Sequence, residues 1–90
     1  YSLSQNYPNP FNNRTQLDFS LPKSSRVRIT IMNVLGQPVR TLAYTDFQAG
    51  THRVVWDGKN DYGQDVAGGI YLIQMEAGSF KQAREMLFLK

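Results

Sequence analysis

Residues 49–71 read AGTHRVVWDGKNDYGQDVAGGIY. Two apolar runs, at residues 52–56 and 70–75, flank a segment rich in glycine, aspartate and asparagine, and the single tryptophan, Trp56, closes the first run. Short apolar runs bounded by turn residues are typical of β-strands. We therefore predict one long β-ribbon over this stretch, and we expect a small two-sheet domain to be built around it.

The length and composition of the chain fit one globular domain. Of its 90 residues, 41% are hydrophobic and 19% are charged, which is ordinary for a folded protein. The chain has no cysteine. It therefore has no disulfide, no thiolate metal ligand and no thiol nucleophile, and packing must hold the fold together.

The distribution of charge does not favour a nucleic-acid partner, and the lengths of the apolar runs do not favour a membrane-spanning segment. The formal charge is +3, from 10 basic and 7 acidic residues, and the basic residues are scattered along the chain. Nucleic-acid binders usually concentrate positive charge on one face. No apolar run approaches the ~20 residues of a membrane helix, so we expect no membrane insertion.

The chain opens YSLSQNYPNPF, with neither an initiator methionine nor the basic-then-apolar start of a signal peptide. We therefore expect the sequence to be a piece of a longer protein.

Alternating apolar and polar residues predict the strands. The predicted strands are residues 16–21, 26–33, 39–44, 52–57, 70–77 and 80–90. The side chains expected to face inward are Leu17, Phe19, Leu21, Val27, Ile29, Ile31, Val54, Trp56, Tyr71, Ile73 and Met75. A polar crossover is expected at residues 45–50.

Two of these strands depart from simple alternation. Val39 and Leu42 are out of phase, which predicts a bulge or a twisted edge. Residues 86–89 are four consecutive apolar residues. We expect either that both faces of the last strand are covered or that a bulge near Glu85 switches the phase.

The amino-terminal segment carries two prolines, Pro8 and Pro10, which exclude a helix and disfavour an interior strand. We predict an extended edge segment with Tyr7 and Phe11 turned inward, in preference to a flexible linker. Together the elements predict an all-β fold, an immunoglobulin-like antiparallel Greek-key β-sandwich of about seven strands. The cysteine pair of antibody domains is absent, so only the architecture carries over.

We find no constellation that predicts catalysis, and we expect a protein that is not an enzyme and needs no cofactor. His52 is the only histidine and lacks the partners that a metal site or a general base requires. No serine lies in a G-x-S-x-G elbow. Gly68 and Gly69 belong to no phosphate-binding motif and are expected to allow unusual backbone geometry.

Two binding alternatives stay open. Asp57, Asn60, Asp61 and Asp65 share one loop. They either stabilise turns through their own backbone or bind calcium, although their spacing does not match the EF-hand pattern. The aromatic residues Tyr44, Phe47 and Tyr62 either pack under loops or form a sugar-binding platform.

Segments along essentially the whole chain resemble the type A C-terminal sorting domains of the type IX secretion system. The segments are NYPNPFN at residues 6–12, FSLP at residues 19–22, VLGQ at residues 34–37 with Val39, AGTH at residues 49–52, VWDG at residues 55–58, GIY at residues 69–71 and the tail REMLFLK at residues 84–90. They occur in order and at fitting spacing. The VWDG and GIY segments are also similar to the immunoglobulin-like domain of flagellar hook-capping proteins.

The resemblance implies a function in protein export. Such a domain ends a larger cargo protein of a Gram-negative bacterium and directs it from the periplasm across the outer membrane, so that the cargo is secreted or attached to the cell surface. The implied partners are the type IX translocon, its sortase-like peptidase and the upstream cargo domain. The alternatives are a structural or assembly module of the hook-capping type and an accessory carbohydrate-binding module.

The resemblance also assigns residues. The motif residues expected to be structural are Pro8, Asn9, Pro10, Phe11, Gly36, Gly50, Trp56, Asp57, Gly69 and Tyr71. The residues expected to carry recognition are Arg84, Met86, Leu87, Phe88, Leu89 and Lys90. Glu85 stands where the family tail commonly has a basic residue. From the residues themselves, we expect the terminal strand to serve as a binding site for the export machinery, because an edge strand offers unpaired amides to a partner strand.

Overall fold

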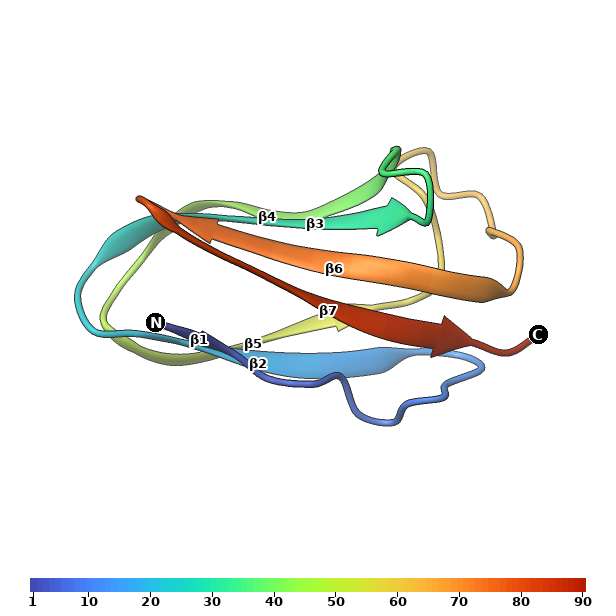
Figure 1. The fold of residues 1–90 in the computed structure, drawn as a ribbon, viewed down its shortest axis with the longest axis horizontal. Coiled ribbons are helices and arrows are strands. Elements are labelled where there is room, and N and C mark those ends of the chain that lie inside the picture. Colours follow the sequence, from blue (N-terminus) through green and yellow to red (C-terminus); the bar gives the residue numbers. More distant parts are fainter.

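The structure, a computed structural model, describes residues 1–90. It contains no helix, and its seven strands form two antiparallel sheets that face each other (Figure 1). The strands are β1 (Ser2–Leu3), β2 (Thr15–Leu21), β3 (Ser25–Asn33), β4 (Pro38–Phe47), β5 (Gly50–Trp56), β6 (Gly69–Ala77) and β7 (Phe80–Phe88). The smaller sheet has the order β1-β2-β5 and the larger has the order β4-β3-β6-β7. The immunoglobulin-like sandwich predicted from the sequence is confirmed.

The predicted ribbon over residues 49–71 is wrong, because β5 and β6 lie in different sheets. β5 pairs with β2, whereas β6 lies between β3 and β7. The rings of Trp56 and Tyr71 meet edge to face with centroids 5.2 Å apart. Each apolar run thus faces the other across the core, and the turn-rich loop of residues 57–68 crosses between the sheets instead of closing a hairpin.

The alternating strands bury the faces that their sequences predict. β2 buries Leu17, Phe19 and Leu21, and the central strands β3 and β6 supply the opposite wall. The buried hydrophobic residues are Leu3, Phe11, Leu17, Phe19, Leu21, Val27, Ile29, Ile31, Trp56, Tyr71, Ile73, Met75, Ala77, Met86 and Phe88. Val54 is only partly buried and packs against this core.

β4 and β7 differ from their predictions in opposite ways. β4 extends to Phe47, so the crossover predicted at residues 45–50 is mostly strand, and the register shifts against β3 confirm the expected irregularity. β7 is regular: its pairing with β6 runs from Phe80 to Phe88 without a shift. Met86 and Phe88 face the core while Leu87 and Leu89 are exposed, so neither the bulge near Glu85 nor a doubly covered strand is present.

Residues 4–12, here called the strap, follow β1. They run along the edge of β2 that is opposite β5, toward the carboxyl end of β7 (Figure 1). Phe11 is buried as predicted, but Tyr7 is 75% exposed, so its predicted inward orientation is wrong. Tyr7 pairs with Gln16, whose side chain lies on the outer face of β2. Directly opposed residues of an antiparallel pair point to the same face, and Tyr7 therefore points outward with Gln16.

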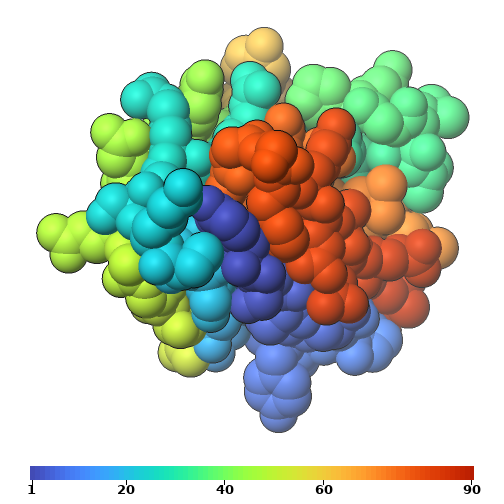
Figure 2. Space-filling model, turned by 60° about the vertical axis from the view of Figure 1, so that its left-hand side comes forward, coloured from blue at the N-terminus to red at the C-terminus, as the bar shows by residue number.

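The amino-terminal segment fills a groove on the side of the sandwich. In Figure 2 it lies between the residues that join β2 to β3, in cyan, and the start of β7, in orange-red. Tyr1 stacks on Phe80 there, with ring centroids 5.2 Å apart. The amino terminus thus packs against the start of β7, at the opposite end of the strand from the carboxyl terminus (Figure 1).

Candidate functional site

The strap is hydrogen-bonded to β7 at the positions that the sequence assigns to recognition. The amide of Phe11 donates to the carbonyl of Leu87 at 3.0 Å, and the amide of Leu89 donates to the carbonyl of Phe11 at 2.8 Å. The side-chain oxygen of Asn9 accepts the amide of Leu87 at 3.0 Å. The strap therefore continues the larger sheet as a short parallel partner of β7.

The predicted mechanism of recognition, strand addition to a free edge of β7, does not fit this arrangement. Besides the bonds to Leu87 and Leu89, the backbone carbonyl of Glu85 accepts a hydrogen bond from the side-chain amide of Gln5 at 2.8 Å. The side chain of Arg84 also donates through Nε to the carbonyl of Leu3 in β1 at 3.0 Å, although this bond pairs no backbone group of β7. Backbone groups that are already paired are not available to a partner, so a strand could add here only by displacing the strap.

Four aromatic rings meet beneath the strap. The Phe11 and Phe88 rings stack in parallel, and Trp56 contacts both at centroid distances of 5.7 and 5.8 Å. Trp56 Nε1 donates to the carbonyl of Lys59 at 2.9 Å, so its polar atom is satisfied. The hydroxyl of Tyr71 donates to the carbonyl of Ala67 at 2.6 Å, and burial raises the pKa of this hydroxyl.

Gly58 is a position that the sequence analysis did not single out. It is buried at φ +74°, and a Cβ added there would lie 2.7 Å from Cζ of Phe88. A Cβ at Gly68 would lie 3.0 Å from the carbonyl oxygen of Phe88. Both glycines therefore allow close packing around Phe88. In the sequence, the glycine directly after Trp56-Asp57 could have indicated the importance of position 58.

Of the six predicted recognition residues, Arg84 is partly buried and bonds the carbonyl of Leu3, and the other five divide into two groups. Met86 and Phe88 are at most 4% exposed and belong to the core. Leu87 and Leu89 are exposed by 37% and 49%, and Lys90 is exposed with its ammonium 5.5 Å from the centre of the Phe88 ring. Only the exposed group can be touched by a partner while the domain stays folded.

The strap is fixed by a buried polar network that the sequence analysis also missed. The side chains of Asn6 and Thr15 both donate to the carbonyl of Pro8, at 3.1 and 2.8 Å, and Asn6 Nδ2 also donates to Thr15 Oγ1 at 3.0 Å. Both side chains are at most 3% exposed. The peptide bonds before Pro8 and Pro10 are cis. Asn6 opens the NYPNPFN motif, which is the signal that could have marked it.

The remaining motif residues lie at turns and strand ends. Gly36, Gly50 and Gly69 all have positive φ, at 78°, 121° and 145°. Asp57 accepts a hydrogen bond from Arg40 at 3.0 Å and ties the end of β5 to β4. These residues therefore lie where the chain turns or where a strand ends.

The acidic loop uses its oxygens within the protein. Asp61 Oδ1 accepts the amide of Thr41, Asn60 Oδ1 accepts the amides of Tyr62 and Gln64, and Asp65 Oδ1 pairs with Lys59 Nζ at 3.2 Å. The bonds of Asn60 are of the turn-stabilising kind, whereas Asp61 ties the loop to β4 and Asp65 pairs with a side chain of the loop. Asp61 also donates its own amide to Val39, so the loop covers part of the outer edge of β4.

His52 and the loop aromatics are spread over the surface. His52 packs against both Phe19 and Phe47, and its Nε2 is 2.7 Å from the carbonyl oxygen of Gln48. Tyr44 packs under Arg26 and Arg28. Tyr62 is 87% exposed on the loop after β5. The three candidate platform residues therefore do not form one row. No helix is present that is long and apolar enough to cross a membrane.

The two facing antiparallel sheets and the tryptophan at the end of β5 define the class as an immunoglobulin-like β-sandwich domain. The family model of the FlgD Ig-like domain matches residues 8–80, and the chain belongs to this family.

Two curated relatives are the basal-body rod modification proteins FlgD of Salmonella typhimurium and Salmonella typhi. Each is 38% identical over 56 residues, which is 62% of this chain and 24% of the relative. The matched part thus spans about a quarter of each relative.

Among solved structures, the chain is similar to PorZ, described as an essential surface component of the type IX secretion system of Porphyromonas gingivalis. The TM-score is 0.63 at 18% identity, over 94% of this chain and 11% of that one. At this identity, the likeness concerns the fold alone.

Proposed function

We propose that the domain is a non-catalytic sorting domain that directs a larger cargo protein through the type IX outer-membrane translocon to the cell surface or the medium. The partners in this proposal are the translocon, its sortase-like peptidase and an upstream cargo domain. The sequence segments that resemble type IX sorting domains motivate it. The FlgD-type fold is compatible with it, and the description of PorZ as a type IX component points to the same export system.

The observation that carries the proposal is the division of the carboxyl-terminal segment. Phe88 and Met86 anchor the segment in the core, while Leu87, Leu89 and Lys90 present an apolar and basic surface beside them. A partner can bind these exposed side chains on the folded domain while the strap stays paired with β7. Leu87 extends the surface across the sheet, because it pairs directly with Ile70, which is also exposed.

The absence of catalysis is part of the proposal. The lone histidine contacts a backbone carbonyl and two aromatic rings, and the loop carboxylates contact donors of the protein. No group of three or more histidine and carboxylate side chains is placed to hold a metal ion. In this proposal the domain is acted on by a peptidase and performs no reaction itself.

A fusion experiment tests the proposal. Residues 1–90 are placed behind a passenger that carries its own periplasmic export signal, in a host with a working type IX system, and the passenger is measured in the periplasm, on the surface and in the medium. We expect export of the passenger. The double variant Leu87→Ser with Leu89→Ser should retain the passenger in the periplasm, because it removes the exposed surface and leaves the core intact.

The matched control is Val34→Ser with Leu35→Ser, which removes two exposed apolar side chains from the β3–β4 turn. It should be exported like the parent fusion. Deletion of residues 86–90 is unsuitable, because it also removes the core residues Met86 and Phe88. Periplasmic retention of the parent fusion, with the domain folded, would refute the sorting function. Export of the Leu87/Leu89 variant would refute the assigned surface.

The second candidate is a structural module of the hook-capping type, and the observation that favours it is membership of the FlgD Ig-like family. In that case the domain is one part of an assembly protein. Chemical cross-linking of the full protein in its native cells would then join this domain to copies of the same chain. The fusion passenger would stay in the periplasm.

A further inference from the structure

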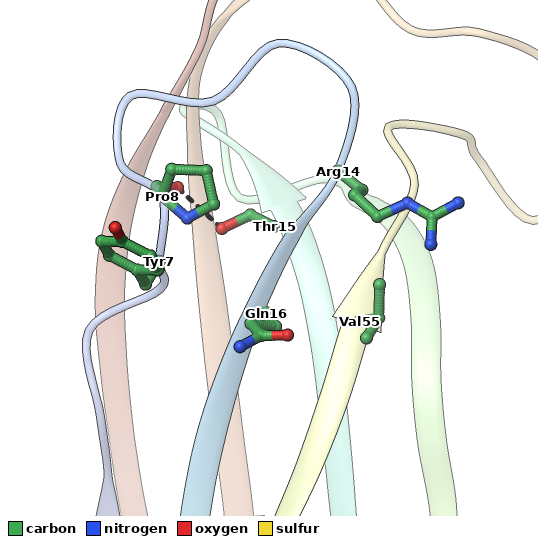
Figure 3. Close-up of a pocket in the computed structure, with 6 residues that line it drawn as sticks. All are labelled: Tyr7, Pro8, Arg14, Thr15, Gln16 and Val55. Atoms are coloured by element: carbon green, nitrogen blue, oxygen red, sulfur yellow. Dashed lines mark hydrogen bonds between the residues drawn. The ribbon is translucent and has the colours of Figure 1, made fainter.

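A surface pocket of about 240 Å³ lies between the strap and the outer face of the smaller sheet (Figure 3). Its lining residues are Tyr7, Pro8, Arg14, Thr15, Gln16 and Val55. Tyr7 and Pro8 form one side, and Gln16 lies between them and Val55 (Figure 3). Arg14 leaves the chain just before β2, and its guanidinium lies above Val55 on the side away from Tyr7 (Figure 3). The sorting proposal makes no use of this pocket.

The strap side of the pocket is rigid. Tyr7 and Gln16 exchange backbone hydrogen bonds in both directions, at 2.7 and 3.1 Å. The carbonyl of Pro8 is held from behind by the buried side chains of Asn6 and Thr15. The ring of Tyr7 is therefore kept exposed by a fixed backbone, and a ligand that packs on it need not order the strap first.

The open polar groups of the pocket are the Arg14 guanidinium, the Gln16 side-chain amide and the Tyr7 hydroxyl. Arg14 makes no ion pair or hydrogen bond within the fold, and neither does the side chain of Gln16. The nearby Arg53 differs, because its Nε donates to Asp18 at 3.0 Å. A guanidinium with no carboxylate in its pocket favours an anionic ligand group, and carboxylate is the planar anion that it binds through two parallel hydrogen bonds.

A second hollow on the other sheet shows the contrast. Its lining includes Arg28 and Glu76, which lie opposite each other on β3 and β6, so this hollow contains an acidic as well as a basic side chain. The pocket at Tyr7 has no such acid and has apolar walls from Tyr7, Pro8 and Val55. These walls suit an aliphatic or aromatic side chain.

We infer that this pocket binds an extended peptide segment that carries an aspartate or glutamate next to an apolar side chain. Arg14 binds the carboxylate, the amide of Gln16 bonds the peptide backbone, and Tyr7, Pro8 and Val55 contact the apolar side chain. The inference is independent of the sorting function, since no residue of the carboxyl-terminal segment takes part.

The test titrates the full domain with the blocked tripeptide acetyl-Leu-Glu-Leu-amide and follows its amide resonances by NMR. We expect shifts confined to Tyr7, Arg14, Gln16 and Val55 and a dissociation constant in the millimolar range. The uncharged counterpart acetyl-Leu-Gln-Leu-amide should bind about five- to tenfold more weakly, because the charge-assisted bond is lost.

Variants of exposed residues keep the test separate from folding. Arg14→Gln should abolish the preference for the acidic peptide, and Tyr7→Ala should weaken both peptides. Arg28→Gln, in the second hollow, should change neither. Absence of shifts, equal binding of both peptides, or binding of acetate as strong as that of the acidic peptide would each overturn the inference.

Discussion

The ring of Phe11 lies parallel to the ring of Phe88, with centroids 4.7 Å apart and an angle of 2° between the planes. The two residues are far apart in the sequence, one in the strap and one at the end of β7. Their contact joins both ends of the chain and covers Trp56. We therefore expect this pair to dominate the stability of the carboxyl-terminal segment.

Replacing Phe11 by alanine should lower the free energy of unfolding by about 3–5 kcal/mol, because it opens a cavity beside Phe88 and Trp56. Urea denaturation measures the change. Tyr7→Ala is the control from the same strap, and it should cost little, because Tyr7 is mostly exposed. Equal losses in the two variants would show that the strap, rather than the Phe11 ring, is what matters.

Comparing alanine substitutions at Gly58 and Gly63 distinguishes the cost of backbone strain from the cost of steric overlap with a side chain. Both have positive φ, at 74° and 77°, but only Gly58 faces Phe88, while Gly63 faces open space. Gly63→Ala should cost about 1–2 kcal/mol for the left-handed backbone. Gly58→Ala should cost about 1–3 kcal/mol more, because Phe88 must move. Thermal unfolding of the two variants tests this, and similar melting temperatures would contradict the close contact.

Asn9 should control the local opening of β7. Asn9→Ala removes the acceptor of the Leu87 amide, and the expected loss is about 1 kcal/mol. Hydrogen exchange at Leu87 should accelerate, while exchange in the central strand β3 changes less. Asn12→Ala, an exposed position in the same segment, is the control. Unchanged exchange protection of the Leu87 amide in Asn9→Ala would contradict a stabilising role for the hydrogen bond from this amide to the Asn9 side chain.

Because the Tyr71 hydroxyl is buried, we expect the free energy of unfolding to decrease at high pH. Burial raises its pKa above the ordinary value of 10.0, so the unfolded chain releases this proton at a lower pH than the folded chain. The contribution to the free energy of unfolding is present below pH 10 and declines as the pH rises above it.

Tyr71→Phe should remove this part of the alkaline decline. At neutral pH it should cost about 1 kcal/mol, because the bond to Ala67 is lost. Urea denaturation at neutral pH and above pH 10 measures both effects. Tyr62→Phe, at an exposed position, should keep the decline of the parent. An identical pH profile for parent and Tyr71→Phe would contradict the assignment.

The sequence by itself determined the class of fold and the buried faces of the regularly alternating strands. Alternation in residues 16–21 and 26–33 identified the buried faces of β2 and β3, because a side chain's face follows from its parity along a strand. Glycine at positions such as Gly36 marked turns correctly, since positive φ is a local property.

Only the tertiary structure decided how these elements meet. It placed β5 and β6 in different sheets, turned Tyr7 outward opposite Gln16, and covered the edge of β7 with the strap. It also divided residues 86–89 into a buried and an exposed row. The reason is that strand pairing depends on contacts between distant residues, such as Phe11 with Phe88, and local alternation does not specify which strand becomes the neighbour of which.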